Sequence, residues 1–73
     1  MDNKDLKKLR EDLMGELKAI NDYQEHIDEA DNEKIKKVLS HVRDDEKEHV
    51  AELIKLLREL DETQEDKFQK EEL

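Results

Sequence analysis

Apolar residues recur along most of this chain at steps of three and four positions, the spacing of one face of an α-helix. The first stripe predicts a helix over residues 4–30, and the second predicts a helix over residues 32–60. Asp31 is expected to cap the second helix, because the chain is expected to turn between Glu29 and Asn32. The first stripe consists of Leu6, Leu9, Leu13, Leu17, Ile20, Ile27 and Ala30, and the second of Ile35, Val38, Leu39, Val42, Val50, Leu53, Leu56, Leu57 and Leu60.

A short third helix is expected over residues 64–72, with Thr63 as its cap and Asp66 at the position where a capping box prefers Glu or Gln. The 73 residues are therefore expected to form one all-α domain, an antiparallel two-helix hairpin followed by this short helix. Two narrow stripes leave apolar surface in water after they pack on each other. Two hairpins would cover that surface, so we expect a homodimer that forms a four-helix bundle.

Composition supports a helical fold that needs a partner. Charged residues make up 51% of the chain, Pro is absent and Gly occurs once, which favours long helices with short connections. Only 33% of the residues are hydrophobic, with one Phe, one Tyr and no Trp, so little material is present for a core within a single chain.

Charge and residue usage also exclude several functions. The absence of Cys excludes a disulfide framework, a thiol nucleophile and an iron site held by thiolates. The net charge of −9 opposes binding to nucleic acid or to an anionic membrane surface, and it attracts cations. No apolar run reaches the length of a membrane span, and the first twelve residues are charged where a signal peptide would be apolar. A soluble cytoplasmic protein is expected.

Three polar residues interrupt the apolar faces of the two long helices. Glu16 lies within roughly 30° of the centre of the first stripe, and Glu46 and His49 lie within about 35° of the centre of the second. The midpoint of Glu16 and Glu46 is residue 31, inside the expected turn. An antiparallel hairpin therefore places the two carboxylates at the same height, with the imidazole one turn away. Burying these groups without partners would be costly, so something must compensate them.

Two interpretations of this arrangement stay open. In one, the Glu and His side chains pair with each other, or the carboxylates lean out to Lys18 or Lys47, and the chain is a non-catalytic helical dimerisation module. In the other, a symmetric dimer assembles four carboxylates and two imidazoles, the ligand set of dinuclear carboxylate sites. Their four negative charges would balance two divalent ions, and such ligation suits iron or manganese better than zinc.

Two segments of the chain resemble the encapsulated ferritins, half-length ferritin-like proteins related to rubrerythrins. The resemblance extends over residues 13–60. It implies a ferritin-like bundle in which Glu16, Glu46 and His49 ligate a di-iron site between subunits, with Tyr23 nearby. The segments that carry it are Gly15-Glu16-Leu17-Lys18-Ala19-Ile20-Asn21-Asp22-Tyr23 and Arg43-Asp44-Asp45-Glu46-Lys47-Glu48-His49.

The same resemblance implies a function and partners. The site would be a ferroxidase that oxidises Fe(II) to Fe(III) for iron storage, with dioxygen or peroxide as oxidant. The protein would be cargo of an encapsulin nanocompartment, and its dimers would assemble into a ring of ten subunits. Two features differ from the family pattern. Gly15 and Lys18 replace acidic residues that often attract metal, and the charged segment 61–73 differs from the usual linker and apolar targeting peptide.

Three further residues, one Tyr and two His, lie near the two stripes. Tyr23 lies two turns from Glu16. Either its hydroxyl hydrogen-bonds a ligand, or the residue is an ordinary aromatic of the core. His26 and His41 lie roughly 110° from their stripe centres, so neither is expected in the metal site.

Overall fold

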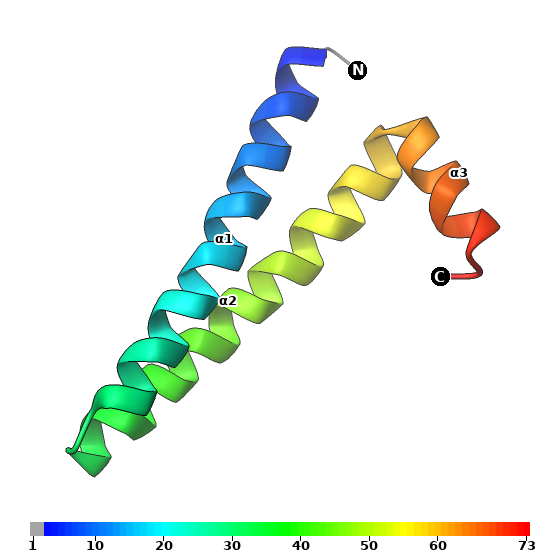
Figure 1. Ribbon diagram of the computed structural model, residues 1–73. Helices are drawn as coiled ribbons and strands as arrows, with labels where there is room; N and C mark the ends of the chain where they lie inside the picture. The colour runs from blue at the N-terminus through cyan, green and yellow to red at the C-terminus, as the bar shows by residue number, and fades with distance from the viewer. Residues whose placement is uncertain (1–2) are drawn as a thin grey trace.

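The computed structural model describes residues 3–73 as three α-helices joined by two short corners (Figure 1). The all-α prediction is confirmed, and each expected helix boundary lies within two residues of the observed one. The largest differences are at the two ends of the third helix, which was expected over residues 64–72. The helices are α1 (Asn3–Glu29), α2 (Glu33–Leu60) and α3 (Glu62–Lys70).

The two long helices run antiparallel and form the expected hairpin. They lie closest together near the turn, and they diverge toward the N-terminal end of α1 and the C-terminal end of α2 (Figure 1). The third helix folds back from the end of α2 and packs against α2 (Figure 1). The open end of the hairpin is therefore also the end that carries α3.

The turn between α1 and α2 is capped by Asn32, so the prediction of Asp31 as the cap is wrong. Asn32 is the last residue with extended backbone, and its side-chain oxygen accepts hydrogen bonds from the backbone N–H groups of Lys34 at 2.9 Å and Ile35 at 3.1 Å. These are two of the N–H groups that a helix start leaves without a partner inside the helix. The helix consequently begins one residue later than expected.

The third helix is capped by Asp61, so the predictions of Thr63 as its cap and of Asp66 in a capping box are wrong. The Asp61 carboxylate accepts a hydrogen bond from the Gln64 backbone N–H at 3.1 Å, and it also pairs with the guanidinium of Arg10 in α1 at 3.0 Å. Asp61 thus caps the end of α2, caps the start of α3 and forms an ion pair with α1. That single-residue corner explains why α3 starts at residue 62.

The third helix is held against α2 by Arg58. The Nε atom of Arg58 donates to the Glu65 carboxylate at 2.7 Å, and its Nη2 atom donates to the carbonyl oxygen of Leu73 at 2.9 Å. Its guanidinium carbon also lies 4.4 Å from the centroid of the Phe68 ring, within the range of a cation–π interaction. The charged tail is therefore an ordered, docked helix.

The hairpin has almost no core of its own. Among residues 3–73 only Leu6 and Leu57 are buried, whereas Met14 is 67% exposed and Val38 is 60% exposed. The shortest dimension of the molecule is 14 Å, close to the diameter of one helix with its side chains. No helix among residues 3–73 has the length and apolarity that crossing a bilayer requires. The expected homodimer stays a prediction, and the exposed apolar side chains agree with it.

Candidate metal centre

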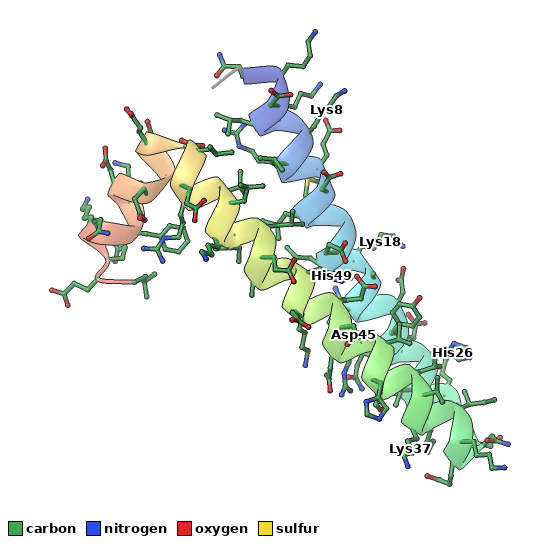
Figure 2. All side chains as sticks on the ribbon, turned by 180° about the vertical axis from the view of Figure 1, so that it is seen from behind. Lys8, Lys18, His26, Lys37, Asp45 and His49 are labelled. Carbon is green, nitrogen blue, oxygen red and sulfur yellow. The ribbon has the colours of Figure 1, made fainter. Side chains whose placement is uncertain are left out.

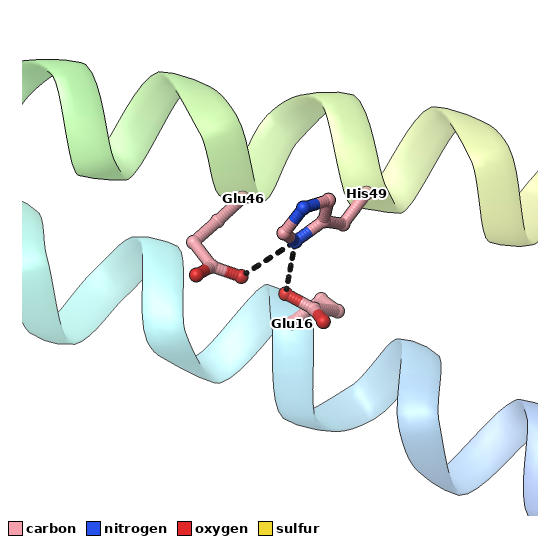
Figure 3. Close-up of side chains that lie close together, drawn as sticks. All are labelled: Glu16, Glu46 and His49. Carbon is pink, nitrogen blue, oxygen red and sulfur yellow. Dashed lines mark hydrogen bonds and ion pairs between the residues drawn. The ribbon is translucent and has the colours of Figure 1, made fainter.

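The three residues predicted as ligands come together halfway along the hairpin. Glu16 projects from α1, and Glu46 and His49 project from α2, three residues apart and therefore one turn apart. Their side chains point toward one another across the gap between the helices (Figure 3). The donor atoms of all three residues lie within 4.8 Å of one another. The equal height expected from the hairpin symmetry agrees with this arrangement.

The two contacts of His49 in this group have a length that two ligands of one ion can have. The Nδ1 atom of His49 lies 3.4 Å from Oε2 of Glu16 and 3.4 Å from Oε2 of Glu46 (Figure 3). Hydrogen bonds from nitrogen to oxygen are usually about 2.7–3.2 Å long, so both contacts are long. Two donors held about 2.1 Å from one metal ion and about 105° apart lie about 3.3 Å from each other.

The group is open to solvent on one side. The side chains of Glu16, Glu46 and His49 are 28%, 19% and 49% exposed, respectively. Two half-buried carboxylates thus face an imidazole of which about half is exposed to solvent. The three side chains have room for an ion and for further ligands from outside the chain.

The lysines that were considered as partners of the two glutamates pair elsewhere. Lys18 contacts Asp22 at 2.6 Å, and Lys47 contacts Asp44 at 3.8 Å. The hydrogen bond to Asp22 raises the pKa of Lys18. Figure 2 shows Lys18 projecting from α1 away from α2. Over the part of the chain that the structure describes, neither lysine neutralises the centre. The interpretation in which the carboxylates pair with these lysines is therefore wrong. The contact between Glu46 and His49 agrees with the alternative in which Glu and His pair with each other.

An open groove surrounds the group, and its charged lining is acidic. Asp12 precedes Glu16 by four residues and Glu52 follows His49 by three, so helical spacing could have placed both on the faces that carry the ligands. Neither acidic neighbour was among the predicted ligands. No Lys or Arg is among the lining residues, which are Glu11, Asp12, Gly15, Glu16, Ala19, Glu46, His49, Glu52 and Leu53.

Tyr23 and the other two histidines lie outside the group. Tyr23 is half-buried on α1, seven residues after Glu16, and within residues 3–73 it forms no hydrogen bond to a ligand. Its expected role beside the site stays a prediction. His26 and His41 are exposed, and Figure 2 shows His26 projecting away from α2.

Comparison with known proteins identifies the family of this fold and ligand group. Residues 1–72 match the model of the EncFtn-like family. The chain belongs to the EncFtn-like family. The resemblance to encapsulated ferritins is thereby confirmed.

Two relatives of this EncFtn-like chain come from Myxococcus xanthus (strain DK1622). The encapsulin nanocompartment cargo protein EncC is 47% identical over 53 residues, which cover 73% of this chain and 41% of that protein. The encapsulin nanocompartment cargo protein EncB is 36% identical over 66 residues, which cover 90% of this chain and 42% of that protein. The EncFtn-like chain thus matches about two fifths of the length of each relative.

Proposed function

We propose that this EncFtn-like chain is a ferroxidase that oxidises Fe(II) to Fe(III) at a paired-iron site between two copies, as encapsulin cargo that stores iron. The observation that carries the proposal is the convergence of Glu16, Glu46 and His49 within 4.8 Å. Iron is the substrate of this reaction, and manganese is the closest substitute for the same donors.

The donor set suits pairs of divalent iron ions. Glu16 and Glu46 contribute two negative charges per chain, and His49 contributes a neutral nitrogen. Two chains would therefore contribute four negative charges, which two Fe(II) ions balance. Without cations these carboxylates would repel one another in a groove that no Lys or Arg lines.

A second copy completes the ligand set. Dinuclear carboxylate sites in four-helix bundles take one Glu from each of two helices and a Glu-x-x-His pair from each of the other two. This chain has one helix of each kind, so two copies supply four helices. Val38 lies eleven residues before His49 and Leu56 lies seven after it, spacings that put all three on one face of α2. Both are exposed, at 60% and 36%, so a second copy over His49 would also cover apolar surface.

The paired arrangement explains how the oxidation proceeds without releasing a one-electron oxygen species. Each of two Fe(II) ions loses one electron. Dioxygen that takes both electrons and two protons becomes hydrogen peroxide, and hydrogen peroxide that takes them becomes two waters. The protein binds and orients the two ions side by side, which makes the two-electron reduction of the oxidant possible. We assign Glu16, Glu46 and His49 to iron binding, and Tyr23 to a supporting position near them.

The cargo part of the proposal is supported by EncC and EncB, whose matched regions cover most of this chain. By this proposal the chain lies inside an encapsulin shell in the cytoplasm, and its dimers assemble further into a ring such as a decamer. Co-expression with an encapsulin shell protein, followed by purification of intact shells, tests this part directly.

The ferroxidase part is tested by adding Fe(II) without oxygen, measuring oligomer size by sedimentation, and then admitting air while recording the Fe(III) absorbance. We expect iron to shift the protein from monomer to dimer and oxidation to exceed the rate in buffer. Glu46→Ala should remove both effects, and the neighbouring exposed Asp45→Ala should keep them. A dimer that ignores metal and oxidises iron at the background rate would instead identify an interaction module.

A further inference from the structure

A hydrogen bond between Arg43 and Gln24 joins α2 to α1 outside the candidate metal centre. The Nη1 atom of Arg43 donates to Oε1 of Gln24 at 2.9 Å, and the Arg43 side chain is only 20% exposed. Each of these side chains also has a partner on its own helix. The Nε atom of Arg43 donates to Asp44 at 3.1 Å, and the Nε2 atom of Gln24 donates to Asp28 at 2.9 Å. Both sides of the link are therefore oriented by a second contact.

The link lies on the flank of the hairpin opposite the acidic groove. At about 100° per residue, Arg43 and His49 lie about 60° to either side of Glu46 around α2. On α1, Gln24 lies about 80° from Glu16, in the direction away from the groove. Neither Arg43 nor Gln24 lines the groove. The two helices are thus joined on one flank by this link, and the groove opens on the other.

Such a link constrains how α2 is rotated about its axis. Apolar stripes of similar Leu, Ile and Val side chains define this rotation loosely, whereas a directed polar contact defines it closely. A rotation of about 20° moves an atom at the helix surface by about 2 Å, as much as a whole metal–ligand bond. The turn holds the helices only at their near ends, and they diverge away from it (Figure 1). The ligands therefore gain from a constraint close to their own level.

We infer that Arg43 is a positioning residue, which through Gln24 holds α2 in the rotation that turns its two ligands toward α1. This inference rests on the proposed function. Arg43 does not line the groove, so it acts through the placement of Glu46, one turn later, and of His49. Bound metal also draws the ligands together. Loss of the link should therefore weaken metal binding without abolishing it.

The test compares Arg43→Met with Lys47→Met. Both variants remove a positive charge that pairs with Asp44, but Lys47 forms its ion pair within α2, whereas Arg43 also contacts α1. Calorimetric titration should show Mn(II) affinity about tenfold weaker in Arg43→Met and unchanged in Lys47→Met. For Fe(II) oxidation, Arg43→Met should raise KM about tenfold and keep kcat within about twofold, because all three ligands remain.

A second pair of variants separates positioning from folding. Gln24→Leu removes the same contact from α1 and leaves Arg43 paired with Asp44. It should weaken Mn(II) binding by a similar factor, and the double variant should bind no more weakly than either single one. Gln24→Glu keeps the acceptor oxygen and should keep the wild-type affinity. Circular dichroism should show equal helix content in all variants, and a loss of helix content in parallel with affinity would assign Arg43 to folding instead.

The possible outcomes distinguish this inference from the proposed function. If the wild type binds Mn(II) and oxidises Fe(II), and Arg43→Met matches it in affinity and KM, the positioning role is overturned while the proposed function stands. The same conclusion follows if the effects of Arg43→Met and Gln24→Leu simply add. If the wild type neither binds Mn(II) nor exceeds the background oxidation rate, the proposed function fails, and the role of Arg43 fails with it.

Discussion

The α2–α3 corner and the candidate metal centre contain similar acidic side chains in opposite surroundings. At the corner two acids face arginines at hydrogen-bond distance: Glu65 lies 2.7 Å from Arg58, and Asp61 lies 3.0 Å from Arg10. Arg58 also donates to a carbonyl oxygen of the tail. At this corner the chain therefore supplies positive charge to both of these acids.

At the candidate metal centre, residues 3–73 supply no such partner. Glu16 and Glu46 face only His49, at 3.4 Å, and the groove around them adds further carboxylates without Lys or Arg. A sequence with fourteen Lys and Arg residues had the means to pair these acids. The acids of the corner are thus paired with arginines of the same chain, whereas the two glutamates of the candidate metal centre have no Lys or Arg partner among residues 3–73. In the proposed function, metal cations provide the positive charge there.

The largest effect expected from this comparison is on metal binding by His49→Ala. Structural zinc sites in zinc-finger peptides release about 10–16 kcal/mol through four ligands, so by analogy we expect the loss of one ligand to cost roughly 3 kcal/mol, or about a 100-fold weaker affinity. Calorimetric titration with Mn(II) measures the change. The exposed His41→Ala is the matched control and should bind as the wild type does. If His49→Ala bound Mn(II) as tightly as the wild type, His49 would not be a ligand, and the two regions would not differ in the way described.

A smaller effect is expected from Arg58→Ala at the corner. This variant loses the hydrogen bonds to Glu65 and Leu73 and the contact with Phe68, together worth about 1–2 kcal/mol of α3 docking. Hydrogen exchange should accelerate in residues 62–70, while Mn(II) affinity stays unchanged. Lys55→Ala removes a positive charge one turn earlier and should leave exchange in α3 unaltered. A parallel loss of metal affinity in Arg58→Ala would mean that the two regions are coupled.

The smallest effect concerns the titration of Asp61. The backbone N–H of Gln64, and next the guanidinium of Arg10, lower the pKa of this carboxyl below its ordinary value of 3.8. Because the pKa is lower in the folded protein, the stabilisation by Asp61 is present above the unfolded pKa and is lost as pH falls through the folded value. Carbon-detected NMR titration should show a midpoint below 3.8.

Two variants sharpen the test of Asp61. Arg10→Ala should move the midpoint of Asp61 upward only in part, since the larger cause is the Gln64 N–H. The stability difference between wild type and Asp61→Ala should be greatest near neutral pH and should shrink in acid. A midpoint of Asp61 at or above the ordinary aspartate value would contradict the assigned contacts.

Much of the hairpin could be predicted because helix periodicity is a local property. The two stripes located α1 and α2 to within one residue at each end, and the symmetry of Glu16 and Glu46 about residue 31 anticipated their meeting. The caps were less predictable. Neighbouring residues Asp31 and Asn32 are both good caps, and the choice between them depends on where the chain bends. The same holds for Asp61 and Thr63.

The docking of α3 could not be predicted in the same way. Arg10 and Asp61 are 51 residues apart, and their contact depends on how far the two long helices diverge. The pairing of Lys18 with Asp22, by contrast, has the i,i+4 spacing of neighbours on one helix face and could have been predicted from the sequence.

The sequence by itself determined three helices, a hairpin and three polar residues on its inward faces, because these follow from residue spacing along each helix. Packing in three dimensions sets three further properties of residues 3–73: the donor atoms converge within 4.8 Å, no Lys or Arg lines the groove around them, and the space beside Gly15 is open. Such properties depend on the distance and angle between helices, which arise from packing between residues far apart in the chain.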